Sequence, residues 1–275
     1  MWLLNTTTLH LKEFSGSTKP AYAILSHTWF ESEVLFHEIH NDPVDEKIKA
    51  RPGFSKIRRF CELAKSRGFD YGWVDSCCID KRSSAELSEA IGSMFAWYRD
   101  ADICIVYLED VPAPVKLNDF KNARWFTRGW TLQELIASEN RSFFAKDWSE
   151  IVDWYFGPYG ELDMLTLVAK ITGVKASVLR DSHKLWACCI AERMSWASSR
   201  QTTRPEDRAY SLMGLFDINI SIQYGEGLQK AFARLQKEIL RTSFDDSIFV
   251  WHSQDTSSGL LAQSPDDFTG LLVLI

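Results

Sequence analysis

Residues 22–29 read YAILSHTW, and this stretch is typical of a strand that lies buried in a parallel sheet and ends in polar residues. Three further apolar runs, at residues 70–75, 103–108 and 141–145, follow the same pattern. Helical patterns separate these runs. Because strands that alternate with helices are typical of a parallel sheet covered by helices, the sequence predicts an α/β fold over residues 1–148.

The helices of this first part are expected between the strands. Residues 54–67 carry apolar side chains at helical spacing and end before Gly68, a residue typical of a helix C-terminus. A second helix is expected to start at Ser83 or Ser84, because serine is a preferred N-cap. Residues 127–138, TRGWTLQELIAS, form the third.

After residue 148 the pattern changes to mostly helices. Helices are expected at residues 161–171, 185–195, 205–215 and 225–241, and a short strand at 247–251. No Gly/Ser-rich linker separates the two halves. The sequence therefore predicts one domain over residues 1–275, with an α/β core at 1–148 and a mostly helical extension at 149–275 packed on it.

Composition limits the classes of function. The 275 residues are 45% hydrophobic and carry a formal charge of -6, which allows a large core and gives no electrostatic footprint for nucleic acid. The basic cluster at residues 56–59 is expected on the solvent side of a helix. No segment has the length of a signal peptide or of a membrane span, so a cytoplasmic location is expected.

Cysteine usage and the end of the sequence add two expectations. The six cysteines include two adjacent pairs, a spacing that suits neither a disulfide framework nor a metal knuckle, so reduced thiols are expected. The sequence ends on the apolar run at residues 271–275, which suggests a chain cut from a longer protein.

Polar side chains gather where the expected parallel strands end. Ser26, His27 and Trp29 follow the first strand, and Asp75 follows the second. Ligands bind outside the carboxyl ends of such strands. The helix that carries Glu134 starts after the third strand. We therefore expect His27, Asp75 and Glu134 to converge on one edge of the sheet, together with Cys77, which also follows the second strand.

Glu134 and Trp130 lie four residues apart, so a helix places them on one face. An indole beside a carboxylate can stack on a planar ring while the carboxylate stabilises an oxocarbenium-like centre, which suits cleavage of an N-glycosidic bond. A structural alternative stays open, because Thr131 and Glu134 also match a capping box. Arg128 could bind a phosphate or pair with Glu134.

Two other chemistries are weaker. His27 and Cys77 follow consecutive strands, as in a caspase-like cysteine protease, although a buried cysteine is often only a small core residue. His37 and His40 are three residues apart, whereas the zinc-protease motif needs histidines four apart. No metal site is therefore expected.

Four long blocks of this sequence resemble the fungal heterokaryon-incompatibility (HET) domain. They are YAILSHTW (22–29), YGWVDSCCIDKRSSAELSEAIGSMFAWYRDADICIVYLEDV (71–111), RWFTRGWTLQELIA (124–137) and EDRAYSLMGLFDINISIQYGEGLQKAFARLQKEI (206–239). The resemblance implies a fungal protein whose domain triggers cell death when unlike strains fuse. It also implies a longer chain, with a receptor-type region on the C-terminal side.

A more distant similarity concerns mechanism. The order of elements resembles a Toll/interleukin-1 receptor (TIR) domain, which has a flavodoxin-like arrangement, and WTLQEL at residues 130–135 is similar to the W-C-x-x-E-L helix of that family. Thr131 stands in place of the family's cysteine. The similarity implies that Glu134 is catalytic in NAD hydrolysis, that NAD is substrate rather than cofactor, and that self-association completes the site.

The nucleotide is then expected to bind a set of side chains drawn from both halves of the predicted core: Ser26, His27, Trp29, Asp75, Arg128 and Trp130. The alternative from another class is a non-enzymatic, self-associating signalling module, in which Glu134 is only a helix cap.

Overall fold

The computed structural model describes residues 1–15, 19–30, 32–40, 44–152, 154–155, 161–253 and 259–270. The chain forms two compact units. Unit 1 comprises Met1–Phe120 and Asn140–Ile151, and unit 2 comprises Lys121–Glu139 and Val152–Ile275. The segment that carries Glu134 therefore belongs to unit 2, and the single domain over 1–275 stays a prediction. The apolar run at 271–275 lies outside the described residues.

Unit 1 is built on a seven-stranded mixed sheet with the order β2-β1-β4-β3-β5-β6-β7. Strands β4, β3, β5 and β6 are parallel, and β1, β2 and β7 pair antiparallel at the two edges. The bounds are β1 Trp2–Asn5, β2 Leu11–Glu13, β3 Tyr22–His27, β4 Tyr71–Trp73, β5 Ile103–Tyr107, β6 Arg141–Phe144 and β7 Glu150–Ile151. The α/β class and its four central strands are confirmed, whereas the edge strands were not predicted.

Strands β3 and β5, in the middle of the sheet, are buried along their whole length, and Leu25 of β3 pairs with Ile105 of β5. Unit 1 carries the helices α1 Phe36–Ile39, α2 Glu46–Lys49, α3 Pro52–Ser66, α4 Ser84–Arg99 and most of α5 Leu117–Lys121. As predicted, Gly68 follows α3 with a φ of +90°, and the Ser83 hydroxyl caps α4 by accepting the N–H of Glu86.

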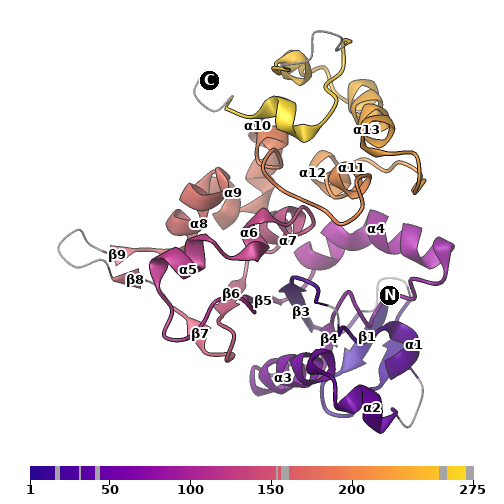
Figure 1. Cartoon of the computed structure of the whole chain (residues 1–275), viewed down its shortest axis with the longest axis vertical. Helices are drawn as coiled ribbons and strands as arrows, with labels where there is room; N and C mark the ends of the chain where they lie inside the picture. Colours follow the sequence, from indigo (N-terminus) through magenta and orange to yellow (C-terminus); the bar gives the residue numbers. More distant parts are fainter. Residues whose placement is uncertain are drawn as a thin grey trace. The chain divides into compact units, whose positions relative to one another are not determined.

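Helices α3 and α4 cover opposite faces of this sheet (Figure 1). The Phe60 ring of α3 lies 2.6 Å from the position that a Cβ on Gly72 would take, so glycine lets α3 approach β4 closely. The next residue, Trp73, points to the other face and packs edge-on against Trp97 and Tyr98 of α4. The Tyr98 hydroxyl also donates to the carbonyl of Leu25 over 2.9 Å.

Unit 2 is mostly helical, as predicted. Its helices are α6 Arg124–Thr127, α7 Thr131–Ala137, α8 Met164–Thr172, α9 Ala176–Arg180, α10 Ile190–Ser195, α11 Asp207–Tyr210, α12 Met213–Phe216 and α13 Leu228–Thr242, joined by the 3-10 helices η2 Ser182–Ala187, η3 Asp246–Phe249 and η4 Pro265–Phe268. A small antiparallel pair, β8 Trp154–Tyr155 and β9 Glu161–Leu162, precedes α8.

Two expectations for unit 2 were wrong in detail. The strand expected at residues 247–251 is absent from this described stretch, which begins with η3, because the Asp245 carboxylate accepts the N–H of Ser247 and caps a helical turn instead. The helix expected from residue 161 starts later, since Asp163 is the N-cap of α8 and accepts the N–H of Thr166.

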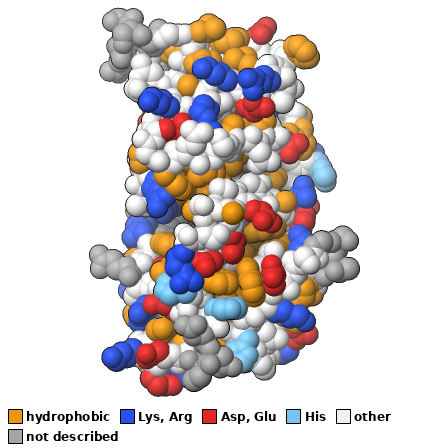
Figure 2. All heavy atoms as spheres, turned by 90° about the vertical axis from the view of Figure 1, so that its right-hand side faces the viewer, with side chains coloured by type: hydrophobic (Ala, Val, Ile, Leu, Met, Phe, Trp, Pro, Cys, Tyr) orange, Lys and Arg blue, Asp and Glu red, His pale blue; other side chains and the backbone are white. Residues whose placement is uncertain are grey.

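Charge is mixed on the surface. On the face drawn in Figure 2, acidic and basic side chains alternate and no large field of one sign forms, as the overall charge of -6 suggests. Over the described ranges, every helix is too short or too polar to cross a membrane.

Candidate functional site

Asp75 gathers the predicted polar side chains of unit 1. The His27 ring donates from Nε2 to Oδ1 of Asp75 over 2.9 Å, and the Trp29 indole donates from Nε1 to Oδ2 over 2.7 Å. Lys81 donates from Nζ to the Asp75 carbonyl over 2.9 Å and stands 3.5 Å from the centroid of the Trp29 ring. The expectation that His27, Trp29 and Asp75 meet at the ends of β3 and β4 is confirmed, and Ser26 lies fully buried beside them in β3.

This arrangement keeps Asp75 ionised. Burial alone would raise the pKa of Asp75, but the Lys81 cation and the hydrogen bonds from His27 and Trp29 outweigh it and hold the pKa well below its usual range. A carboxylate is thus fixed beside an indole and an ammonium group. Such a group can orient a polar ligand but is a poor proton donor at neutral pH.

The same geometry opposes the cysteine-nucleophile alternative. Cys77 is 0% exposed, and its hydrogen bond to Cys78 together with burial raises the pKa of the Cys77 thiol well above the usual value. The two ring nitrogens of His27 face Asp75 and the carbonyl of Thr28. A reactive thiolate needs a depressed pKa and a base beside it, so Cys77 is a core residue here.

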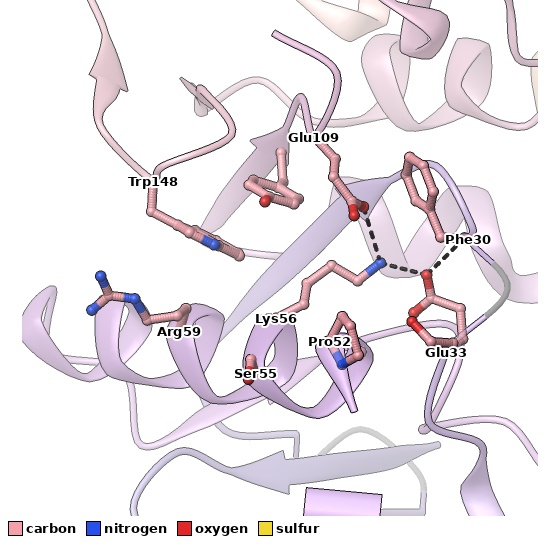
Figure 3. A pocket seen from close by; sticks show the side chains of 11 residues that line it. Phe30, Glu33, Pro52, Ser55, Lys56, Arg59, Glu109 and Trp148 are labelled. Atoms are coloured by element: carbon pink, nitrogen blue, oxygen red, sulfur yellow. Dashed lines mark hydrogen bonds and ion pairs between the residues drawn. The ribbon is translucent and has the colours of Figure 1, made fainter. Parts of the chain in front are cut away.

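A hollow of about 330 Å³ is lined by residues of α3 and by residues that follow β3 and β5 (Figure 3). Lys56 lies within it, 6% exposed, and pairs with the equally buried Glu33 and, over 3.8 Å, with Glu109. Glu33 in turn accepts the N–H of Phe30 over 3.0 Å and stands 3.9 Å from Nδ1 of His27. A chain of polar contacts through His27 and Glu33 therefore links Asp75 to the hollow.

The sequence had placed Lys56 on the solvent side of a helix, and this was wrong. Lys56 is four residues before Phe60 and three after Gly53, so all three share the buried face of α3. The helical spacing could have predicted the burial of Lys56. No sequence pattern predicts the burial of Glu33, because its partners are distant in sequence and its loop has no regular pattern.

In unit 2, Glu134 lies on α7, whose residues are all buried. Glu134 is 6% exposed, and Trp130, one turn earlier, is half-buried. Thr131 is not the N-cap residue that the capping-box alternative requires. Trp130 is the N-cap and makes no side-chain cap hydrogen bond, and Thr131 is already helical. The preceding helix α6 explains this difference, because the Thr131 hydroxyl donates to the Trp125 carbonyl of α6 over 2.6 Å.

A buried guanidinium faces this helix. Arg200 is 2% exposed and donates from Nη1 to the Arg128 carbonyl over 2.9 Å and to the Thr131 hydroxyl over 3.1 Å. Burial lowers the pKa of Arg200 to about 9, and the charge of Glu134 opposes that shift. Within the described part of the chain, its Nη2 has no hydrogen-bond partner. No local sequence pattern pointed to Arg200, which is far from α7 along the chain.

Trp130 is anchored from a third segment of unit 2. Its indole donates to Asp207 over 3.2 Å, and Tyr224 donates from its hydroxyl to the same carboxylate over 3.0 Å. The Arg204 guanidinium lies 3.9 Å from the centroid of the Tyr224 ring. The half-buried Arg128 side chain donates to the Thr203 hydroxyl over 3.0 Å.

The predicted site residues thus form two groups. Ser26, His27, Trp29 and Asp75 belong to unit 1, whereas Arg128, Trp130 and Glu134 belong to unit 2. That the two groups share one site stays a prediction. Neither group is a metal centre: in the described ranges no three His, Cys, Asp or Glu side chains are placed to hold an ion.

Comparison with known proteins identifies the family. Residues 22–117 match the sequence model of the heterokaryon incompatibility protein (HET) family. The vegetative incompatibility protein HET-E-1 of Podospora anserina is 41% identical over 238 residues, which cover 83% of this chain. The chain is a HET domain protein. No solved structure matches it significantly.

The residue ranges of the family matches can be compared with the clusters described above. The HET match contains the Asp75 cluster and, apart from Trp148, the lining of the Lys56 hollow, and it ends before α7. A second family of unknown function, DUF8212, matches residues 230–270 in unit 2. The HET chain spans 17% of the length of HET-E-1, so it corresponds to one part of that relative.

Proposed function

We propose that this chain is a cell-death effector of heterokaryon incompatibility and that it hydrolyses NAD at the nicotinamide-ribose bond through Glu134. The HET family and the name of its relative, a vegetative incompatibility protein, support the biological role. The similarity of α7 to the catalytic helix of TIR domains supports the reaction. The structural observation that carries the proposal is a buried carboxylate, Glu134, one helical turn from the half-buried indole of Trp130.

The chemistry follows from these two groups. As the bond between nicotinamide and ribose lengthens, positive charge develops on the ribose, and a carboxylate in a low-dielectric site stabilises that charge strongly. The bonding electrons leave with nicotinamide, and water then adds to the ribosyl cation and loses a proton. Arg200 has an indirect role in this proposal. The positive charge of its buried guanidinium favours the carboxylate form of Glu134, which the reaction requires.

The other side chains have binding roles in this proposal. The Trp130 indole stacks on a planar ring of the nucleotide, and Arg128 binds a phosphate. Ser26, His27, Trp29 and Asp75 complete the nucleotide site from unit 1, and self-association brings the parts together. NAD is the substrate, no prosthetic group takes part, and a receptor-type region on the C-terminal side supplies the activating signal.

The test is the release of nicotinamide from NAD by concentrated or artificially clustered protein. Glu134→Gln keeps the shape of the side chain and removes its charge, so cleavage is expected to fall by at least about 100-fold. Glu238→Gln is the matched control, since Glu238 lies on α13 and pairs with exposed Arg241. If clustered wild-type protein kills cells while NAD stays intact, or if the folded Glu134→Gln variant remains equally toxic, hydrolysis is not the mechanism.

A specific observation favours the second candidate, a non-enzymatic self-associating module. Four apolar side chains within residues 240–250 of unit 2 are exposed: Leu240, Phe244, Phe249 and Val250. Phe244 is fully exposed, and exposed apolar groups of this kind mark protein interaction surfaces. For such a module, Phe244→Glu is expected to abolish both self-association in sedimentation and toxicity, while Glu134→Gln changes neither.

A further inference from the structure

The turn that joins α6 to α7 lies beside the segment that precedes α11, and both belong to unit 2. The N–H of Gly129 donates to the Gln201 carbonyl over 2.8 Å, and the N–H of Gln201 donates to the Thr127 carbonyl over 2.7 Å. Glycine permits this close approach, because a Cβ on Gly129 would lie 2.5 Å from Cγ2 of Thr202. Side chains from two distant parts of the sequence therefore come together here.

Arg204 is exposed, and an aromatic ring holds its side chain in place. Its guanidinium carbon lies 3.9 Å from the centroid of the Tyr224 ring. This ring is itself fixed, because the Tyr224 hydroxyl donates to Asp207 over 3.0 Å and the ring packs edge-on against Tyr210. Among the described residues, no acceptor takes a hydrogen bond from the Arg204 guanidinium. Contact with the ring uses the face of the guanidinium and leaves the N–H groups at its edge for a ligand.

Arg128 reaches the same place from the turn before α7. Its Nη1 atom donates over 3.0 Å to the hydroxyl of Thr203, the residue next to Arg204. Burial raises the pKa of Asp207, and the charges of Arg204 and Arg128 both oppose this rise, so both cations lie near that carboxylate. Within the described ranges, neither guanidinium forms an ion pair with a carboxylate. Two arginines with N–H groups to spare are thus held close together.

Access, and not net charge, favours an anion at this place. The formal charges balance, since Asp207 and Glu206 lie near the two arginines. However, Asp207 is 9% exposed and Glu206 only 4%. Both oxygens of Asp207 accept hydrogen bonds from aromatic side chains, and Oε1 of Glu206 accepts the N–H groups of Gly225 and Gly227 over 2.8 and 3.0 Å. A ligand that arrives from solvent therefore meets the guanidinium groups, which can only donate.

The third accessible group is an indole. Trp130 lies two residues after Arg128 and is half-buried, so part of its ring is open to solvent. Its ring nitrogen is engaged with Asp207, which fixes the plane of the ring. Guanidinium groups bind phosphate oxygens through paired hydrogen bonds, and an aromatic face stacks on a flat base. A nucleotide with a diphosphate carries both of the groups that these side chains would bind.

We propose that Arg204 and Arg128 together bind the diphosphate group of the substrate nucleotide, which makes Arg204 a further substrate-binding residue of unit 2. The identification of the ligand as a nucleotide rests on the proposed function. NAD is then a better substrate than nicotinamide riboside, which contains the same glycosidic bond but no phosphate.

ADP and adenosine form a matched pair of probes, because they share the base and the ribose and differ in the diphosphate. Calorimetry on the whole chain is expected to show saturable binding of ADP and binding of adenosine that is weaker by about tenfold or more. Arg204→Gln is expected to weaken ADP binding by a similar factor and to leave adenosine binding unchanged. Arg204→Lys keeps the charge but loses the planar fork of donors, so it should restore only part of the affinity.

Arg241→Gln is the matched control, since Arg241 is an exposed arginine of α13 that pairs with Glu238. Circular dichroism and urea unfolding establish that each variant is folded. The proposal is overturned if ADP does not bind saturably or if adenosine binds as tightly. It is also overturned if folded Arg204→Gln binds ADP as the wild-type chain does, or if Arg241→Gln weakens ADP binding equally.

The result is independent of the proposed reaction, because ADP has no bond between nicotinamide and ribose. ADP binding that depends on Arg204 in a chain that leaves NAD intact would contradict hydrolysis and support the diphosphate site. NAD hydrolysis with an unchanged KM in Arg204→Gln would contradict the role of Arg204 and leave hydrolysis standing.

Discussion

The indole nitrogen of Trp130 donates a hydrogen bond of 3.2 Å to Oδ2 of Asp207, 77 residues further along the chain. The other carboxylate oxygen of Asp207 accepts the Tyr224 hydroxyl over 3.0 Å. Both oxygens are thus used to hold aromatic rings in place. The orientation of the indole beside Glu134 is therefore set by the start of α11, and not by α7 alone.

Asp207→Asn is expected to lower the free energy of unfolding by about 1–3 kcal/mol, because the amide nitrogen cannot accept the hydrogen bond that the replaced carboxylate oxygen accepted. Burial, although opposed by the bonds from Trp130 and Tyr224, raises the pKa of Asp207. The folded chain then binds this proton more readily than the unfolded chain. The contribution of Asp207 to stability is consequently greatest below the unfolded pKa of about 3.9 and falls as the pH rises through the folded value.

Urea unfolding across this pH range measures that effect. The advantage of the wild-type chain over Asp207→Asn is expected to shrink as the pH rises from about 4 towards neutrality. Tyr224→Phe is a useful comparison, since it removes one donor and leaves the carboxyl group. An advantage that grows with pH would contradict the raised pKa.

Arg200 and Glu134 are expected to stabilise unit 2 as a pair. Arg200→Met alone leaves a buried carboxylate without its nearby cation and should cost about 3–5 kcal/mol. Glu134→Gln in the same background removes the charge that was left behind, so part of this loss should be recovered.

A double-mutant cycle by urea unfolding isolates the interaction between the two side chains. A coupling free energy of about 1–3 kcal/mol is expected, with the double variant more stable than the sum of the single changes predicts. Additive effects would show that the two charges do not interact in the folded chain. Glu238→Gln in the Arg200→Met background is the control, and it should recover nothing.

The central strands could be predicted from the sequence because burial on both faces produces continuous apolar runs, as in β3 and β5. The strands β1, β2 and β7 could not, since all three are short; β2, with the sequence LKE, is also largely polar and exposed. The polar residues after β3 and β4 were found for a topological reason: carboxyl ends of neighbouring parallel strands meet at one edge.

Local motifs were less dependable than topology. The spacing of Thr131 and Glu134 matches a capping box, yet the preceding α6 supplies carbonyls to the Thr131 hydroxyl and moves the N-cap to Trp130. Partners that are distant in sequence, such as Arg200 for Glu134 or Glu33 for Lys56, leave no local pattern. These are the groups that set the electrostatics of both clusters.

Asp75 is expected to show the opposite pH dependence to Asp207. Its pKa is held below the usual range, so the unfolded chain binds this proton more readily than the folded chain. Its contribution to stability is present above the unfolded pKa of about 3.9 and is lost as the pH falls towards the folded value. Asp75→Asn should cost about 2–4 kcal/mol at neutral pH, because it weakens two charge-assisted hydrogen bonds.

The measurement is the urea midpoint of both proteins between about pH 3 and pH 7. The cost of Asp75→Asn is expected to be largest near neutrality and to diminish in acid. Asp70→Asn serves as a control, since Asp70 is 70% exposed and pairs with the half-exposed Lys65. A cost for Asp75→Asn that is constant with pH would mean that His27, Trp29 and Lys81 do not favour its charged form.

Gly53→Ala tests whether the close approach of Ser32 and Glu33 to α3 is essential. A Cβ at this position would lie 2.2 Å from the Ser32 carbonyl oxygen and 2.9 Å from the Cα of Glu33, both backbone atoms that cannot rotate away. Alanine is a better helix former than glycine by about 1 kcal/mol, so propensity alone would stabilise α3. Overpacking of this kind costs about 1–3 kcal/mol, and the clash is expected to win.

The control for this prediction is Gly259→Ala, because a Cβ there meets no atom within 4 Å. Urea unfolding should show a lower midpoint for Gly53→Ala and a change within about 0.5 kcal/mol for Gly259→Ala. A Gly53→Ala chain that is more stable than wild type would show that the loop moves aside freely, and that the hollow is not built around this contact.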